Sequence, residues 1–219
     1  HGRVLPLAAG VKNARHDLHI IAEAGDGATF SEGVNHLVHA VRNDYTILFI
    51  HHNNENYGLT TGQPSSLTPK GCKMNCAPEG SPVDALDPLQ FLMGLNPGFV
   101  ARGCYANVDH LAEVFREALR HKGFAFVDVL QTCPTYNRHT PHEWYLNHTK
   151  DVSEIKGYDP TDKKKAQKVI EDTSKWYTGV LYKNPEKVPF LESMGIDRTG
   201  KNLVDKVSPV SVKNLVKNV

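Results

Sequence analysis

The chain has 219 residues, of which 40% are hydrophobic and 22% charged, and its formal net charge is +1. This length suits one large α/β domain or two small ones. The near-zero charge argues against a broad nucleic-acid surface, and no apolar run approaches the roughly 18 residues that a membrane span needs. We therefore expect neither nucleic acid nor a membrane as a partner.

The first part of the chain alternates between predicted helices and strands. Residues 4–14 are rich in Ala, Leu and Val and predict a buried helix. Residues 18–24 are mostly apolar, with β-branched members, and predict a strand. We expect Ser31 to cap a helix that runs to about residue 42, because apolar side chains recur on one face there. Residues 45–50 form a near-continuous apolar run, which is typical of a central strand in a parallel sheet.

The alternation resumes after a long loop. Residues 51–82 are rich in Gly, Pro, Asn and Ser, and a loop of that length inside a compact domain is usually functional. Residues 84–95 predict a short helix, residues 99–102 a strand, residues 108–122 an amphipathic helix and residues 124–130 another strand. This order predicts an α/β fold with a mainly parallel sheet and helices on both faces. Ligands of such sheets bind beyond the carboxyl ends of the strands.

The last third of the chain differs in charge from the rest. Residues 1–149 contain 14 acidic and 11 basic side chains, whereas residues 150–219 contain 10 acidic and 14 basic ones. The basic excess fits either a solvated tail or an arm that lies on an acidic partner. We divide the chain into a ligand-binding domain, residues 1–150, and a helical or extended extension, residues 151–219, which we expect to contact a partner.

The cysteines indicate a reducing compartment. The four of them, at positions 72, 76, 104 and 133, are too sparse for a disulfide-stabilised secreted scaffold, and no signal peptide is recognisable. We therefore expect a cytoplasmic protein. The chain begins with His1 rather than Met, and we expect the natural protein to extend further upstream.

The most specific chemical signal is a pair of motifs at two predicted strand ends. Gly25-Asp26-Gly27 follows the first strand, and Asn53-Asn54 follows the second. Because parallel strands end at the same edge of a sheet, these motifs are expected to meet. Carboxylate and amide oxygens suit Mg²⁺, which prefers to share its ligands with phosphate. The glycines allow close approach of a diphosphate, and the N–H groups of the next helix face the same charge.

Further segments extend this pair into a resemblance. A Gly-Asp-Gly motif followed by Asn-Asn some 25 residues on is the fingerprint of thiamine diphosphate enzymes. The chain resembles, over residues 1 to about 150, the β subunit of 2-oxoacid:ferredoxin oxidoreductases. The resemblance rests on Asn54-Glu55-Asn56-Tyr57-Gly58-Leu59-Thr60-Thr61-Gly62-Gln63, on His1-Gly2-Arg3, on residues 33–43, 99–103 and 121–125, and on Cys133-Pro134-Thr135-Tyr136-Asn137. It implies a thiamine diphosphate-binding fold.

The resemblance implies a role for each matching residue. Asp26 and Asn54 bind Mg²⁺ through their side chains, and Asn56 adds its backbone carbonyl. Thiamine diphosphate is implied to lie against several further residues: Gly25, Asp26, Gly27 and Ala28 at the diphosphate, Gly58 and Leu59 along the cofactor loop, and His1 near the cofactor. No residue of the chain is assigned a catalytic role.

Cys133 resembles the last of four cysteines that hold a [4Fe–4S] cluster in this family. The other three family cysteines normally lie upstream of the His-Gly-Arg motif and are absent from this sequence. One thiolate cannot hold such a cluster. We expect an upstream segment to complete it; otherwise the chain has no cluster. Cys72 and Cys76 are interpreted as bystanders, and Cys104 as a small buried residue.

The implied reaction is the oxidative decarboxylation of a 2-oxoacid to an acyl-CoA and CO₂. Electrons pass singly through the cluster to ferredoxin. Because no second thiamine-binding domain is evident, an α subunit is required. Pyruvate, branched-chain 2-oxoacids and 2-oxoglutarate all remain open as substrates. The alternatives are a thiamine diphosphate-dependent decarboxylase or synthase half-subunit without a cluster, and a non-catalytic scaffold subunit.

The chain is also rich in histidine, with 12 such residues. His51 and His52 precede the Asn pair, and either one could face the thiamine ring. His139 and His142 are interpreted as surface residues, because no further metal-binding pattern accompanies them.

Overall fold

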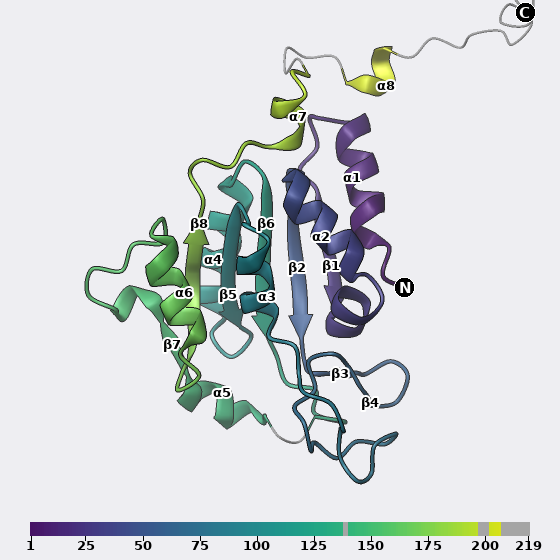
Figure 1. The fold of residues 1–219 in the computed structure, drawn as a ribbon, viewed down its shortest axis with the longest axis vertical. Coiled ribbons are helices and arrows are strands. Elements are labelled where there is room, and N and C mark those ends of the chain that lie inside the picture. Colours follow the sequence, from purple (N-terminus) through teal and green to yellow (C-terminus); the bar gives the residue numbers. More distant parts are fainter. Residues whose placement is uncertain (138–139, 197–201, 207–219) are drawn as a thin grey trace, which may run out of the picture.

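A computed structural model describes residues 1–137, 140–196 and 202–206. Its centre is a six-stranded sheet in the order β1-β2-β6-β5-β8-β7 (Figure 1). Strands β1, β2, β6 and β5 run parallel to one another, and β8 joins the edge of β5 in the antiparallel direction. The strands are β1 Ile21–Gly25, β2 Ile47–Asn53, β5 Phe99–Cys104, β6 Phe124–Leu130, β7 Thr149–Asp151 and β8 Trp176–Lys183. The expected α/β fold with a mainly parallel sheet is confirmed.

Helices cover both faces of the sheet. The larger core cluster packs side chains of α1, α2, α3 and α6 against one face, around Phe49 and Phe126. The smaller cluster packs α4 against the other face, around Ala101 and Val127. This burial of apolar area on two sides is the main force that holds the strands between the helices. The helices are α1 Val4–Ala14, α2 Val34–Asn43, α3 Pro88–Gly94, α4 Val108–Arg120, α5 His142–His148, α6 Lys163–Glu171, α7 Phe190–Ser193 and α8 Leu203–Lys206.

The start of the second helix differs from the sequence prediction. Ser31 does not cap it; Gly27–Ser31 forms a short π-helical turn, and Gly33 precedes α2. The Ser31 hydroxyl instead shares a hydrogen bond of 2.6 Å with the Ser66 hydroxyl. The wider turn follows directly on the Gly-Asp-Gly motif, where the backbone bends out of β1.

Several other elements differ in length from those predicted, most clearly β2 and α3. Strand β2 continues to Asn53, because it lies between β1 and β6 and pairs with both. Helix α3 begins only at Pro88, since the Asp87 side chain accepts the backbone N–H groups of Leu89 and Gln90. The extension of β2 makes His51, His52 and Asn53 strand residues rather than loop residues.

The region after residue 148 contributes strands as well as helices. Strand β8 pairs with β5 through a register shift at Val100/Ala101, and β7 pairs with β8. Residues 207–219, the end of the basic extension, lie outside the described residues. No helix in the described ranges is long and apolar enough to cross a membrane. The β3–β4 segment, Asn56–Tyr57 with Gln63–Pro64, and α5 lie beyond the same end of the sheet, the β3–β4 segment below β2 and α5 on the side of β7 and β8 (Figure 1).

Candidate thiamine diphosphate and magnesium site

The structure brings the two motifs together at the carboxyl ends of β1 and β2. These strands are parallel neighbours, with Gly25 opposite His52. The Asn54 backbone N–H donates to Asp26 Oδ1 at 3.4 Å, and the Ser65 hydroxyl donates to Asp26 Oδ2 at 2.5 Å. Only 1% of Asp26 is exposed. A buried carboxylate therefore stands at the position that the motif spacing predicts.

Burial disfavours the ionised form of this carboxylate. Desolvation raises the pKa of Asp26 above its ordinary value, while nearby His51 and the Ser65 hydroxyl act in the opposite direction. A buried carboxylate that is costly to ionise is stabilised when a cation binds to it. The environment of Asp26 therefore suits a metal ligand, whose charge a bound cation would balance.

Asn54 and Asn56 fold back on each other beside Asp26. The Asn54 side-chain oxygen accepts the Asn56 backbone N–H at 3.3 Å, and Asn56 Nδ2 donates to the Asn54 carbonyl at 2.7 Å. Glu55 between them has a φ of +59°, a left-handed conformation that is rare for a side-chain-bearing residue. Polar oxygens thus lie beside Asp26 on a tightly wound loop.

Several buried polar atoms at this edge lack a partner. Among the described residues, the Asn53 and Asn56 side-chain oxygens and His51 Nε2 have no hydrogen bond. Such atoms are uncommon in folded proteins unless a ligand, ion or water completes them. The unpartnered amide oxygens and the carboxylate of Asp26 are of the hard oxygen type that Mg²⁺ prefers.

Close contacts leave no room for a side chain at Gly27 and Gly62. A Cβ atom on Gly27 would overlap the Tyr57 ring, and one on Gly62 would lie 2.5 Å from the Tyr136 ring. The turn that joins β3 to β4 carries Gly58 and Leu59, and Leu59 is 97% exposed. The first backbone N–H groups of the π-helical turn, at Gly27 and Ala28, lie at a helix start, where anions bind readily.

His1 lies away from the Asp26–Asn54 contact. Its Nδ1 is 3.6 Å from Glu32 Oε2, and its side chain is 91% exposed. Gly2 packs against the backbone of Glu32 and Gly33, which follow the π-helical turn. The described contacts of His1 are therefore with the far end of that turn.

The neighbouring strand ends carry a buried polar network that the sequence analysis did not identify. Asp128 on β6 accepts three hydrogen bonds at its side chain: from His51 Nδ1 at 2.9 Å, from Asn53 Nδ2 at 3.1 Å and from Arg102 Nε at 2.7 Å. Burial opposes ionisation of Asp128, but Arg102 and His51 outweigh it and hold the pKa of Asp128 at about 2. The sequence does contain a feature that could have revealed this network: an imidazole or charged side chain lies near the end of each of three apolar strands, at His51, Arg102 and Asp128.

The two adjacent histidines face opposite sides of the sheet. The His51 ring is buried between Phe30 and Phe126, with ring centroids 5.0 and 5.6 Å away. His52 is partly exposed on the other face, beside Glu23 and Gln131. His51 is therefore the one that interacts electrostatically with Asp26.

Comparisons with known proteins agree with this geometry. Residues 1–129 match the family model of the thiamine pyrophosphate enzyme, C-terminal TPP binding domain. Residues 133–196 match the model of the C terminal part of the pyruvate ferredoxin oxidoreductase beta subunit. The chain belongs to the thiamine pyrophosphate enzyme family. Within that family, its relatives are β subunits of 2-oxoacid:ferredoxin oxidoreductases.

Two curated relatives and one solved structure illustrate the similarity. A 2-oxoacid:ferredoxin oxidoreductase subunit beta from Sulfolobus sp is 36% identical over 88% of this chain and 66% of its own length. Its counterpart from Saccharolobus solfataricus is 37% identical over 84% of this chain and 64% of its own length. A 2-oxoglutarate:ferredoxin oxidoreductase from Magnetococcus marinus superposes with a TM-score of 0.82 at 28% identity, over 91% of this chain and 70% of that one. The chain thus spans just under two thirds of these curated relatives.

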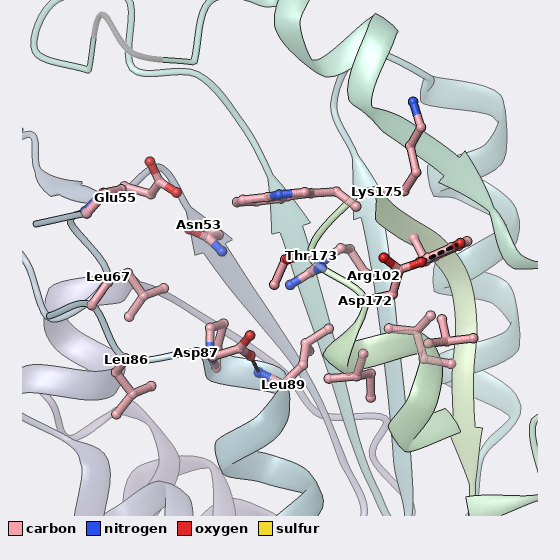
Figure 2. A pocket seen from close by; sticks show the side chains of 18 residues that line it. Asn53, Glu55, Leu67, Leu86, Asp87, Leu89, Arg102, Asp172, Thr173 and Lys175 are labelled. Carbon is pink, nitrogen blue, oxygen red and sulfur yellow. Dashed lines mark hydrogen bonds between the residues drawn. The ribbon is translucent and has the colours of Figure 1, made fainter. Parts of the chain in front are cut away.

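A cavity of about 230 Å³ adjoins the loop of Asn54 on the α3 side of the sheet. Figure 2 shows Asn53 and Glu55 on one side of it, with Arg102 and Thr173 opposite. The Arg102 guanidinium lies 5.1 Å from the centre of the Trp176 ring, a cation–π contact. Burial, with smaller effects from Asp26 and Asp128, raises the pKa of Glu55 to about 7.

All four cysteines, Cys72, Cys76, Cys104 and Cys133, are free thiols. Cys133 follows β6 and is half-buried, Cys72 and Cys104 are buried and Cys76 is exposed. Burial raises the pKa of Cys104, as expected of a small buried residue. In the described ranges, no group of three or more His, Cys, Asp or Glu side chains is arranged to hold a metal ion. These residues therefore do not by themselves form a [4Fe–4S] site.

Proposed function

We propose that this chain is the β subunit of an enzyme that oxidatively decarboxylates a 2-oxoacid, with thiamine diphosphate, Mg²⁺ and CoA, and that reduces ferredoxin. The observation that carries the proposal is the contact between Asp26 and the Asn54 backbone at two neighbouring strand ends. The π-helical turn Gly27–Ser31 begins directly after Asp26. The family of the relatives supports the proposal independently.

In this proposal the residues of the chain hold the cofactor rather than perform bond chemistry. Asp26, the Asn54 side chain and the Asn56 carbonyl would bind Mg²⁺. The backbones of Gly25, Gly27 and Ala28 would bind the diphosphate, with Gly58 and Leu59 along the cofactor loop. The assignment of His1 to the cofactor rests on the resemblance alone. When bound, thiamine diphosphate supplies the electron sink that decarboxylation of a 2-oxoacid needs.

The buried network would act on the electrostatics of this site. Asp128 keeps His51 and Arg102 fixed in place, and His51 favours the ionised form of Asp26. A carboxylate that is already oriented and charged binds Mg²⁺ without a large rearrangement. The network would therefore stabilise the bound metal indirectly, through its effect on the metal ligand Asp26.

The remaining parts of the enzyme are proposed on the resemblance. An α subunit would complete the cofactor site, and residues 151–219 would contact it. Cys133 would be one ligand of a [4Fe–4S] cluster, whose other ligands would come from outside the described residues. We further propose a cytoplasmic location, which the free thiols favour.

The proposal is tested on the full-length subunit assembled with its α partner. We expect CoA-dependent reduction of ferredoxin with one of pyruvate, 3-methyl-2-oxobutanoate or 2-oxoglutarate. Asp26→Asn should lower this rate at least about 100-fold, because it removes the anionic metal ligand. Asp84→Asn is the matched control, since Asp84 is exposed and pairs only with Lys70 among the described residues.

An assay of iron in the same preparation separates the alternatives. A protein without iron that decarboxylates 2-oxoacids without ferredoxin would be a cluster-free thiamine diphosphate enzyme. An assembly without magnesium-dependent affinity for thiamine diphosphate would be a scaffold, and the proposal would then be wrong.

A further inference from the structure

Two loops that are far apart in the sequence meet beside the metal motif. The metal loop, residues 54–62, follows β2, and segment 133–137 follows β6. Asn137 is 4% exposed and joins the two. Its backbone N–H donates to the Cys133 carbonyl at 3.0 Å, and its side-chain Nδ2 donates to the Asn54 carbonyl at 3.1 Å.

The same side chain reaches the next residue of the metal loop. Asn137 Nδ2 lies 3.3 Å from Glu55 Oε2 and 2.9 Å from Thr140 Oγ1, and Asn137 Oδ1 accepts the Thr140 N–H. Glu55 has a φ of +59°, so the contact falls at one of the positions of the loop where a side-chain-bearing residue adopts a left-handed backbone conformation. A strained residue keeps such a conformation only when its surroundings fix it.

A ring contact links the same two segments at a second place. Gly62 has a φ of +88°, and the Tyr136 ring occupies the space that a Cβ atom on Gly62 would need. The Gly62 N–H donates to the Tyr57 carbonyl at 2.8 Å, and the Tyr57 ring lies against Gly27 of the diphosphate motif. Contacts therefore run without interruption from segment 133–137 to the turn that follows Asp26.

We propose that Tyr136 and Asn137 are positioning residues for the magnesium and diphosphate site. They hold the metal loop in the conformation that presents Asn54 and Asn56 to Asp26. The inference rests on the proposed function, since it takes this site to bind Mg²⁺ and thiamine diphosphate.

The physical reason is the entropy of the loop. A loop that is already held in its bound conformation loses little freedom when the ligand arrives, so affinity is higher. By linkage, any ligand that binds the ordered loop also stabilises the contacts that order it. Cofactor binding should therefore reduce the motion of segment 133–137, including Cys133, although this segment contains none of the proposed metal ligands.

The first test measures cofactor affinity by calorimetric titration of the full-length subunit, assembled with its α partner, with thiamine diphosphate and Mg²⁺. Asn137→Asp keeps the size of the side chain and removes its N–H donors. We expect affinity to fall about 10-fold or more, with a higher Mg²⁺ concentration needed for half-saturation. Asn147→Asp is the matched control, because Asn147 Nδ2 makes an exposed hydrogen bond to the Glu143 carbonyl within α5; it should change neither quantity.

Tyr136 provides a second pair of variants, in case Asn137→Asp fails to fold. Tyr136→Ala removes the ring beside Gly62 and should weaken binding of thiamine diphosphate, whereas Tyr136→Phe retains the ring and should restore it. A structural role unrelated to the site would lower the melting temperature of both ligand-free variants without changing the magnesium dependence, and that result would contradict the inference.

The second test follows backbone hydrogen exchange with and without thiamine diphosphate and Mg²⁺. In the wild-type chain both residues 26–31 and segment 133–137 should become protected. In Asn137→Asp, protection of segment 133–137 should be lost. Equal affinity of wild type and Asn137→Asp, or no protection of segment 133–137 in a wild-type chain that binds, would overturn the inference. A wild-type assembly without any affinity would instead contradict the proposed function.

Discussion

Each end of the central sheet holds a buried aspartate near a histidine, yet the two aspartates behave in opposite ways. At the carboxyl end, Asp128 accepts hydrogen bonds from His51, Asn53 and Arg102, and its pKa is about 2. At the amino end, Asp44 accepts the Phe124 N–H, and burial raises its pKa to about 6. The difference is the buried cation, because desolvation acts on both side chains.

The comparison distinguishes the carboxyl end of the sheet, a binding edge, from the amino end, a packing edge. Asp44 Oδ2 and His121 Nε2 have no partner among the described residues, and burial lowers the pKa of His121 to about 4. Both side chains fill the space beside Gly98 and Gly123. Burial of an ionisable group is therefore no evidence of function by itself. What distinguishes the carboxyl edge is the paired, charged network around Asp128 beside the unpartnered amide oxygens of Asn53 and Asn56.

The largest expected effect comes from Asp128→Asn. The change leaves Arg102 charged and mostly buried, and a broken buried pair costs about 3–5 kcal/mol. We expect the free energy of unfolding in urea to fall by that amount at neutral pH. A loss below about 1 kcal/mol would show that the network contributes little, and that the two ends do not differ as described.

The next largest effect is a pH dependence of the free energy of unfolding, which arises from Asp44. Its folded-state pKa of about 6 exceeds the ordinary value of 3.8, so the folded protein holds this proton more tightly than the unfolded chain. The stabilisation is fully present below pH 3.8 and is lost as the pH rises through about 6, at most about 3 kcal/mol in all.

Unfolding of wild type and Asp44→Asn between pH 4 and pH 8 tests this dependence. The stability difference between the two proteins should shift with pH in favour of Asp44→Asn at the upper end. A difference that stays constant with pH would mean that Asp44 is ionised in the folded state throughout, as Asp128 is.

A smaller effect is expected from Gly123→Ala at the amino end. Gly123 has a φ of +146°, and a Cβ atom there would overlap Asp44 Oδ2. We expect a loss of about 1–3 kcal/mol in thermal unfolding experiments. Gly94→Ala is the matched control, because a Cβ atom on Gly94 meets nothing within 4 Å; equal losses in both variants would contradict the account of the packing edge.

Much of the fold and the central contact of the site are predictable from the sequence. The strand at residues 124–130 agrees with β6 residue for residue, because a fully buried run is apolar almost throughout. The meeting of Asp26 with Asn54 follows from two parallel strand ends. Local pattern and strand direction are sufficient for these features, since neither depends on long-range side-chain partners.

Other parts of the site depend on contacts that no local pattern reveals. Ser65 reaches Asp26 from 39 residues away, within a loop that has no periodicity. Asn137 reaches Asn54 across 83 residues. Strand β8 follows a short, polar α6, and its pairing with β5 is antiparallel, so it departs from the alternation that predicts the first four strands. Tertiary packing decides each of these features.

The most direct test of the central claim replaces Mg²⁺ by Mn²⁺ and measures the ³¹P couplings of the bound metal by electron–nuclear double resonance. With thiamine diphosphate and the wild-type chain, we predict couplings to the diphosphate phosphorus atoms, which show that Mn²⁺ and the diphosphate share one site. Asp26→Asn should abolish them, and Asp84→Asn should leave them unchanged. Identical couplings in wild type and Asp26→Asn would contradict the claim that the carboxyl edge of β1 and β2 holds the metal.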